Sequence, residues 1–369
     1  MARRNPSRRD ALKLVGGIAA GAALGAVSPL RSALAAPAIG KDQVLTVSVW
    51  GGVSQDSVIA NVQPEFVKQT GATIAYDIGG VGARYNKLLA QKDNPTIDVF
   101  FGGDENMVTG LKAGVLMPIQ RKALPNAADV GSWAFGLKTG QTADTLGGVP
   151  VSVNAYVLAY NPDTVKDPIT SYADMWKPEF AGKLAYAAPV HTSMPQLTII
   201  AAEMSGGSAT NIDPGFKKLA DLRPAKLTVF WTDWAPLLKT GDVTLATEYL
   251  YYLETMKNDK YPIAYVYPKE KAIGSISHLG LVKGTKNEEL AGAFMNIMLE
   301  PSVQKAVAVG TYQGPTNTKV QLSDAEKARC ASAANVDQIR FFDPELLAAS
   351  RAVWTERLNT EVVPQWRTR

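Results

Sequence analysis

From residue 45 onward, apolar and polar positions follow two different periods. Residues 45–50 alternate, which predicts a strand that stops at Gly51-Gly52. The apolar positions of 58–67 recur every three or four residues, which predicts a single helix that ends at Gly71. Strand-like segments at 72–78 and 97–101 and helical segments at 84–91 and 106–113 follow. This β-α-β-α-β order predicts a mainly parallel sheet covered by helices.

The same alternation continues in a second α/β unit. The segment 149–159 is long enough to cross from one lobe to another, and the apolar segment 275–282 could carry the chain back, so the pattern indicates two lobes joined by two or three crossings. The other predicted strands are 183–187, 243–249 and 263–267, together with one strand that ends at 230–231. The predicted helices are 196–204, 216–222, 287–298, 302–309, 324–334 and 344–358.

The first 35 residues differ from this pattern. Six basic residues and one acid occur there, and the segment between Lys13 and Arg31 carries no charge and is rich in Ala and Gly, which predicts a removed signal peptide over 1–35 rather than a membrane anchor. The pair Arg8-Arg9 before the apolar stretch is typical of twin-arginine export, with an ordinary secretory signal as the alternative. The small residues Ala33 and Ala35 suit cleavage before Ala36.

Composition and charge narrow the function classes. A chain of 369 residues with 46% hydrophobic and 20% charged residues is typical of a soluble protein of about two domains. Removal of 1–35 changes the formal charge from +4 to −1, so the basicity gives no support for nucleic-acid binding. The single cysteine, Cys330, excludes an internal disulfide and a lipid-anchored N-terminus at the cleavage site. These features indicate an untethered exported protein.

Catalytic and cofactor motifs are missing from the sequence. Gly79-Gly80-Val81-Gly82 does not fit a dinucleotide-binding loop and is explained by a turn between a strand and a helix, so no cofactor is expected. His191 and His278 are 87 residues apart, and nothing in the sequence places either one beside a serine and an aspartate. A secreted hydrolase that uses His191 or His278 therefore stays an alternative, and a non-enzymatic protein is favoured.

Aromatic residues stand at several predicted strand ends. Ligands of open α/β sheets bind at the carboxyl ends of the strands, where aromatic rings can enclose them. Core packing explains any single one of these rings about equally well, but Trp50, directly before two glycines, favours a ligand site. The set is Trp50, Trp231, Trp234, Tyr249, Tyr251, Tyr252 and Tyr267.

Short blocks along the mature chain carry a family resemblance. The most specific are 171–182 (SYADMWKPEFAG) and 314–317 (GPTN), and the others are 49–52, 66–71, 97–99 and 266–270. In these blocks the chain resembles the periplasmic solute-binding proteins of ATP-driven (ABC) importers, in particular spermidine/putrescine receptors and the related ferric-ion receptors. The resemblance implies a two-lobed α/β periplasmic-binding-protein fold of type II, with the ligand in the interlobe cleft.

The resemblance also implies an organisation and a role. Lobe 1 would hold 36–150 with 280–315, and lobe 2 would hold 151–279 with 316–369, with hinges near 150–154 and 276–280. Such a protein closes its lobes over one small molecule in the periplasm of a Gram-negative cell and presents it to the permease subunits of the importer. It acts as a monomer without a cofactor, a membrane anchor or a nucleic-acid partner.

Individual ligand residues can be carried over from the polyamine receptors. Trp50 matches the aromatic residue that they place against the ligand, and Tyr249 falls where they use a second one. Their ammonium-binding carboxylates are missing, because those positions read His191, Thr192 and Ser277 or His278, while Asp104 and Glu248 remain as candidate acids. A smaller amine, an amino acid or an organic acid is therefore favoured over a long polyamine. The expected ligand residues are Trp50, Gly51, Gly52, Asp104, His191, Thr192, Trp231, Tyr249 and Ser277.

The ferric receptors give a second interpretation. Tyr251 and Tyr252 resemble the paired tyrosines that supply phenolate ligands to iron, a hard cation that suits such oxygens. The histidine or acid that the first lobe often contributes is replaced by Ser54. Iron therefore stays an alternative, and no metal is expected otherwise.

Overall fold

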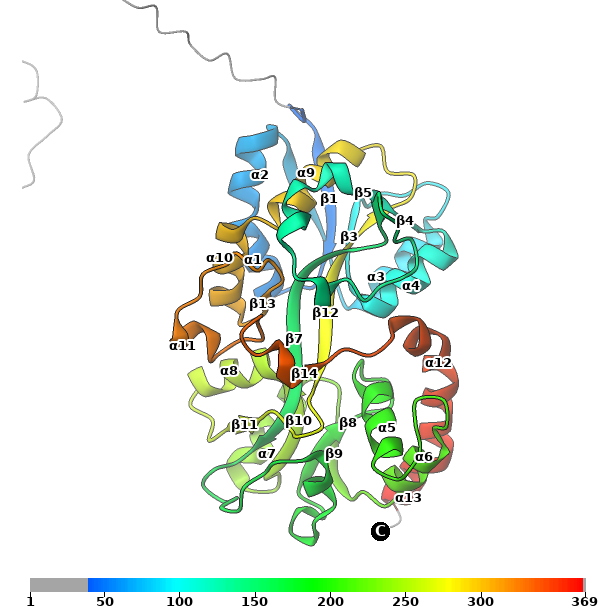
Figure 1. The fold of residues 1–369 in the computed structure, drawn as a ribbon, viewed down its shortest axis with the longest axis vertical. Coiled ribbons are helices and arrows are strands. Elements are labelled where there is room, and N and C mark those ends of the chain that lie inside the picture. The colour runs from blue at the N-terminus through cyan, green and yellow to red at the C-terminus, as the bar shows by residue number, and fades with distance from the viewer. Residues whose placement is uncertain (1–38, 368–369) are drawn as a thin grey trace, which may run out of the picture. The chain divides into compact units, whose positions relative to one another are not determined.

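The computed structural model describes residues 39–367, and its central feature is a mixed sheet with the strand order β2-β1-β3-β12-β7-β10-β8-β9 (Figure 1). The predicted signal peptide lies outside the described residues. Strand β1 (Val44–Val49) pairs in parallel with β2 (Thr73–Ile78) on one side and with β3 (Val99–Gly103) on the other. The predicted parallel arrangement of these three strands, and with it the α/β fold class, is confirmed.

Two long strands join the two parts of the sheet. β7 (Val149–Tyr160) and β12 (Ala272–Val282) are antiparallel to each other, and β12 also pairs with β3 through residues 277–281. At its other end, β7 pairs with β10 (Leu245–Tyr249), which lies beside β8 (Leu184–Ala187) and β9 (Pro224–Thr228). We call β1–β3 the first half-sheet and β8–β10 the second. The predicted lobe boundaries stay a prediction.

Helices cover both faces of the sheet (Figure 1). One hydrophobic cluster continues along one face of both half-sheets, under helices of the first half and of the second. The opposite face carries separate clusters, one with Met107 at the first half-sheet and one with Leu197 at the second. The helices are α1 (Val53–Asn61), α2 (Gln63–Thr70), α3 (Val81–Ala90), α4 (Asp104–Ala113), α5 (Met194–Glu203), α6 (Asp213–Ala220), α7 (Ala235–Thr240), α8 (Leu250–Asn258), α9 (Glu288–Ile297), α10 (Pro301–Thr311), α11 (Asp324–Lys327), α12 (Pro344–Arg357) and α13 (Val363–Arg367).

Shorter elements complete the described chain. The short strands are β4 (Leu116–Met117), β5 (Ile119–Gln120), β6 (Thr145–Leu146), β11 (Ala264–Val266), β13 (Gly314–Pro315) and β14 (Ile339–Arg340). The 3₁₀ turns are η1 (Arg121–Ala123), η2 (Pro125–Asp129), η3 (Ser132–Ala134), η4 (Tyr172–Trp176), η5 (Pro178–Phe180), η6 (Trp231–Asp233) and η7 (Val336–Gln338), and η8 (Leu358–Val362) is a π-helical turn.

Two helix predictions were wrong. The single helix predicted over 58–67 is split into α1 and α2 at Val62, because Pro64 lacks an N–H and therefore stands in the first turn of a new helix. The helix predicted over 324–334 ends at Lys327. Beyond that residue, the Asn335 side chain accepts from the Ser332 N–H and donates to the Cys330 carbonyl, and such local bonds compete with helical ones.

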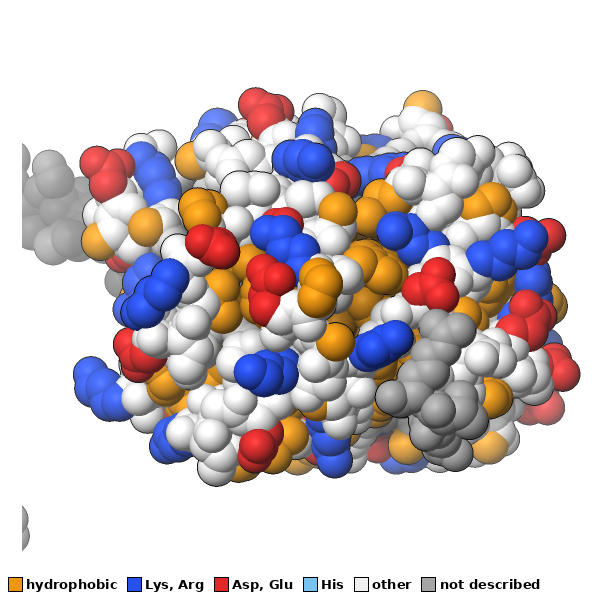
Figure 2. All heavy atoms as spheres, turned by 90° about the horizontal axis from the view of Figure 1, so that it is seen from below, with side chains coloured by type: hydrophobic (Ala, Val, Ile, Leu, Met, Phe, Trp, Pro, Cys, Tyr) orange, Lys and Arg blue, Asp and Glu red, His pale blue; other side chains and the backbone are white. Residues whose placement is uncertain are grey.

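On the face shown in Figure 2, basic and acidic side chains are interspersed, and no large area carries one sign of charge. Among residues 39–367, no helix has the length and apolar character needed to span a bilayer.

The Cys330 side chain is buried, and burial raises its pKa to about 12, which disfavours the reactive thiolate.

Candidate functional site

The carboxyl ends of the two half-sheets point toward each other. β3 ends at Gly103, which lies opposite Ser277 of β12, and Ser277 lies opposite Ser152 of β7. β10 runs the other way and ends at Tyr249, opposite Tyr156 of β7. The two edges are therefore four residues of β7 apart, or about 13 Å at ~3.3 Å per residue. We call this region, with the residues that follow the strand ends, the facing-edge site.

Trp50 lies on the first edge, directly after β1. Its half-buried ring contacts Phe101 edge to face at a centroid distance of 6.2 Å, and the Arg84 guanidinium lies 4.9 Å from the ring centroid. Gly51 and Gly52 follow, both exposed, and Gly52 is the residue before α1, with a φ of 66°, a conformation that favours glycine. The structure thus places Trp50, Gly51 and Gly52 together at the first edge.

Arg84 is the buried charge beneath this edge. Its Nε donates to the Gly79 carbonyl at 2.8 Å, and its Nη1 donates to the carbonyls of Ser48 at 3.1 Å and Phe101 at 2.9 Å. These carbonyls lie within two residues of the carboxyl ends of β2, β1 and β3. Arg84 therefore holds the first edge together and supports the Trp50 ring from behind.

Asp104 opens α4 beside the middle of β12. Its Oδ2 accepts from the Ile276 N–H at 3.3 Å, and its Oδ1 lies 3.5 Å from His278 Nδ1. Burial lowers the pKa of His278 and raises that of Asp104, so the contact is weaker than a formed salt bridge. The Asp104 side chain keeps 25% of its surface exposed, so one carboxylate of the first edge can still reach a ligand.

Hydroxyl groups line the second edge. The Tyr249 hydroxyl shares a hydrogen bond with Thr192 Oγ1 at 3.0 Å and accepts one from Ser193 Oγ at 3.1 Å. His191 is buried, and its Nδ1 accepts from the Ser193 N–H at 3.1 Å. Burial and the nearby Arg351 lower the pKa of His191 to about 4, so the ring is neutral at physiological pH. His191, Thr192 and Tyr249 are thus brought together in an uncharged, polar wall.

The crossing strands supply polar groups between the edges. Asn154 of β7 donates through Nδ2 to the Ser277 hydroxyl of β12 at 3.4 Å, which is a weak bond. The Asn154 Oδ1 is one of two buried side-chain polar atoms, within residues 39–367, that have no hydrogen-bond partner, and Arg84 Nη2 is the other. An unpaired buried acceptor is costly, so Asn154 is a candidate contact for a ligand N–H or O–H.

Glu248 lies behind the second edge. Its carboxylate is buried, accepting from the Trp234 Nε1–H at 3.2 Å and the Tyr249 N–H at 2.8 Å. Burial outweighs these bonds and raises its pKa to about 7, so a large fraction of Glu248 is protonated at neutral pH. Both of its oxygens have partners in the protein, which makes it a poor ligand for an ammonium group.

Trp231, Tyr251 and Tyr252 form an aromatic group next to this edge. The rings of Tyr251 and Tyr252 are 4.2 Å apart, Tyr251 stacks on Tyr249 at 5.4 Å, and Trp231 lies 6.4 Å from Tyr252. Burial raises the pKa of both Tyr251 and Tyr252, which disfavours the phenolate that iron requires. Within the described residues, no group of three or more His, Cys, Asp or Glu side chains could hold a metal.

Large apolar side chains are exposed on both edges. On the first edge these are Val53, which follows β1, and Ile78, the last residue of β2; on the second they are Val190 and Phe230, which follow β8 and β9. Each exposes more than half of its surface, from 52% for Ile78 to 63% for Val190. Burial of these four side chains against a ligand or against the opposite edge would remove their apolar surface from water.

Neither histidine is arranged for hydrolysis. Across the described part of the chain, no hydrogen bond joins the ring of His191 or His278 to a serine hydroxyl: His191 bonds the Ser193 backbone and His278 lies 3.3 Å from the Ile276 carbonyl. A serine nucleophile needs such a bond to lose its proton. Within residues 39–367, neither histidine ring is therefore paired with a serine nucleophile.

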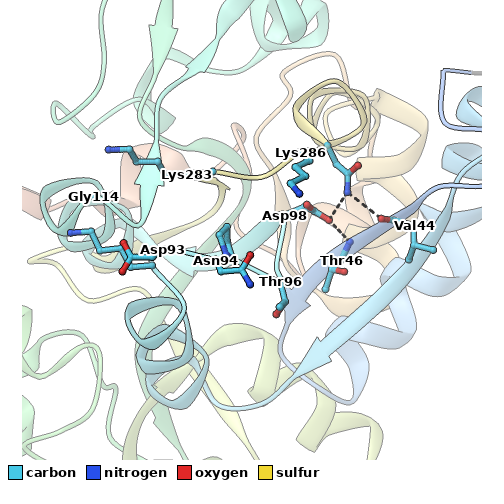
Figure 3. A pocket seen from close by; sticks show the side chains of 13 residues that line it. Val44, Thr46, Asp93, Asn94, Thr96, Asp98, Gly114, Lys283 and Lys286 are labelled. Atoms are coloured by element: carbon cyan, nitrogen blue, oxygen red, sulfur yellow. Dashed lines mark hydrogen bonds between the residues drawn. The ribbon is translucent and has the colours of Figure 1, made fainter.

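A separate hollow lies away from the facing-edge site. It has a volume of about 600 Å³ and lies at the amino ends of β1 and β3, where Lys92, Lys283 and Lys286 surround it (Figure 3). Asp98, the buried acid at this hollow, is already satisfied by the Thr46 N–H and two side chains. Ligands of α/β sheets bind at the carboxyl ends of strands, so we place the functional site at the facing edges and not here.

Sequence reasoning missed Arg84, Asn154, Ser193 and Arg351. Their partners are backbone carbonyls or residues far away in the sequence, so no local pattern indicates them. Asn154, a polar residue in a mostly apolar predicted strand, was the visible signal among these four.

Known proteins resemble this chain over most of its length. A family model described as "Bacterial extracellular solute-binding protein" matches residues 64–334. The "Spermidine/putrescine-binding periplasmic protein 1" of Haemophilus influenzae is 26% identical over 243 residues, covering 64% of this chain and 66% of that protein. The "Thiamine-binding periplasmic protein" of Salmonella typhimurium is 24% identical over 273 residues, covering 73% and 77%.

A solved structure has a similar fold. The crystal structure of an ABC transporter protein from Clostridium perfringens superimposes with a TM-score of 0.76 and 25% sequence identity, covering 86% of this chain and 99% of that one. The matched proteins are named for binding and transport.

Proposed function

The chain belongs to the bacterial extracellular solute-binding proteins, and on that premise we propose that it is the substrate-binding component of an ABC importer, which captures one small organic solute at the facing-edge site and delivers it to a membrane permease. The observation that carries this proposal is that the strand ends at Gly103 and Tyr249 face each other about 13 Å apart along β7, with Trp50 on the same edge as Gly103. A molecule of that size can contact both edges at once. Closure over it would also cover the exposed Val53, Ile78, Val190 and Phe230.

The charges at the site favour a ligand with no more than one positive charge. A long polyamine needs a carboxylate for each ammonium group that it buries. Glu248 is saturated by Trp234 and Tyr249, so Asp104 remains as the acid able to pair with a ligand. The neutral wall of Thr192, Ser193 and Tyr249 suits hydroxyl, amide or carboxylate groups, and the aromatic group suits a flat ring. A single amine, an amino acid or a small organic acid fits this site.

Location and partners are part of the proposal. The basic leader over 1–35, with Arg8-Arg9, supports twin-arginine export to the periplasm of a Gram-negative cell, where the mature chain would act as an untethered monomer. The relatives carry "periplasmic" in their names. The lobes would be those of the sequence prediction, 36–150 with 280–315 and 151–279 with 316–369, and no enzymatic step or cofactor is needed.

A thermal-shift screen of residues 36–369 tests the proposal. We expect stabilisation by one class of compound among putrescine, spermidine, thiamine, amino acids, organic acids and ferric citrate, because a ligand at 100 times its Kd adds about 2.7 kcal/mol to the free energy of unfolding. A response to spermidine alone would refute the charge argument. A response to ferric citrate with a phenolate-to-iron band that Tyr251→Phe abolishes would replace the proposal with iron capture.

Two substitutions locate the site once a panel compound binds. We expect Trp50→Ala and Tyr249→Ala each to raise the Kd about tenfold or more, because each removes one aromatic wall and about 1.4 kcal/mol of binding free energy corresponds to a factor of ten. Isothermal titration calorimetry measures this. Trp176→Ala, which removes a half-buried tryptophan bonded to the Lys218 carbonyl away from the edges, is the matched control. Unchanged affinity in both site variants would mean that the ligand binds at another site.

A further inference from the structure

Helix α12 lies against both halves of the protein. At its start, Glu345 accepts from the Thr139 N–H at 2.9 Å and pairs with Lys112 of α4 at 2.9 Å. At its other end, Trp354 and the following Leu358 are buried in the cluster of the second half-sheet. Between these ends α12 contacts α5, so it runs from the first half to the second along one side of the facing-edge site (Figure 1).

Arg351 lies in the middle of this helix and bonds both edges. Its guanidinium forms a two-point ion pair with Glu105 in the first turn of α4, with Nη2 2.5 Å from Oε1 and Nε bonded to Oε2. The same group donates to the Thr192 carbonyl at 2.8 Å and, more weakly, to the His191 carbonyl at 3.4 Å. One side chain thus bonds the residue next to Asp104 on the first edge and the loop before α5 on the second.

We propose that Arg351 is a positioning residue for ligand capture, which holds the 191–192 loop at a fixed distance from the start of α4. This inference rests on the proposed function. The planar guanidinium can bond a carboxylate at two points and still donate to a carbonyl, which a lysine ammonium cannot reproduce. Because Thr192 Oγ1 is bonded to the Tyr249 hydroxyl, a displaced Thr192 would also displace the polar wall of the second edge.

The consequence is a preformed binding site. When the two edges are already at the right separation, ligand binding does not have to supply the free energy that orders the two halves, and the affinity is higher. If the loss of Arg351 reduces the population of the competent arrangement to about one tenth, the apparent Kd rises about tenfold. Arg351 bonds the backbone carbonyls of His191 and Thr192, two of the predicted ligand residues, so its effect would pass through the position of this loop and of Glu105.

The distance between the halves can be measured without a ligand. Spin labels at Lys92→Cys and Lys226→Cys, two exposed positions on the first half and on β9, report this distance by pulsed dipolar spectroscopy, in a Cys330→Ser background. We expect Arg351→Ala to shift the distribution to longer distances and to broaden it, Arg351→Lys to give an intermediate distribution, and the double exchange Glu105→Arg with Arg351→Glu to restore part of the wild-type distribution.

Arg357→Ala is the matched control on the same helix. Arg357 pairs with Asp213 and Glu361, which both lie on the second half, so its loss should leave the distance unchanged. Equal shifts in the Arg351 and Arg357 variants, or no shift in folded Arg351→Lys and Arg351→Ala, would overturn the proposal. The readout needs no ligand, so a failed ligand screen with a shifted distance would count against the proposed function alone. For a panel compound that binds, the Kd should rise about tenfold in Arg351→Ala.

Discussion

Arg84→Met is expected to lower the free energy of unfolding by about 3 kcal/mol. The substitution keeps most of the apolar stem of Arg84, whose side chain is 2% exposed, but removes the donors to the carbonyls of Gly79, Ser48 and Phe101. Each buried carbonyl left without a partner costs about 1 to 3 kcal/mol. Burial lowers the pKa of Arg84 from 12.5 to about 10, because the buried charge is unfavourable. Removing this charge therefore offsets roughly 3 kcal/mol of that loss.

Urea unfolding at neutral pH measures this effect, with equal slopes required for the comparison. Arg121→Met is the control, because Arg121 also lies over an aromatic ring, that of Phe135, but at the surface and with one weak bond of 3.4 Å. It should change the free energy of unfolding by no more than about 0.5 kcal/mol. A similar small change in Arg84→Met would mean that water or neighbouring groups satisfy the three carbonyls and that Arg84 does not stabilise the first edge.

The positions of the strands could be predicted because each half-sheet has a strong local pattern. The alternation of 45–50 and the apolar stretches 97–101 and 149–159 coincide with β1, β3 and β7 within about two residues. Tyr249 ends β10 as predicted, but Tyr251 and Tyr252, which were also predicted at a strand end, lie in α8, which begins at Leu250. Aromatic rings fit a half-buried strand and a helix facing a core, so their type alone does not distinguish the two.

The candidate site could be predicted in part. Tyr249 ends β10 and Trp50 directly follows β1, and a strand end in an α/β sheet is a local feature that also has a functional meaning. The family resemblance, now confirmed, added His191, Thr192 and Ser277. The contacts that hold the edges could not be predicted from a local sequence pattern. Arg351 is 246 residues from Glu105, and only folding brings them together.

Glu248→Gln should remove a pH dependence of stability. In the folded protein, burial raises the pKa of Glu248 from 4.5 to about 7, so the folded state binds this proton more tightly than the unfolded state does. The stabilisation from Glu248 is therefore fully present below about pH 4.5 and is lost as the pH rises through 7. The shift corresponds to about 3 kcal/mol. Between pH 5 and pH 8, wild type should lose about 2.5 kcal/mol more stability than the variant.

Urea midpoints at pH 5, 6, 7 and 8 test this. The glutamine offers one acceptor instead of two to Trp234 and Tyr249, so the variant can be less stable at every pH, and the slope against pH is the diagnostic quantity. Glu289→Gln, at an exposed position in the first turn of α9, should keep the wild-type slope. Equal slopes in wild type and Glu248→Gln would mean that Glu248 stays ionised when folded. A buried carboxylate behind Tyr249 would then add negative charge to the second edge, and the site would favour a ligand with two amines over a neutral or anionic one.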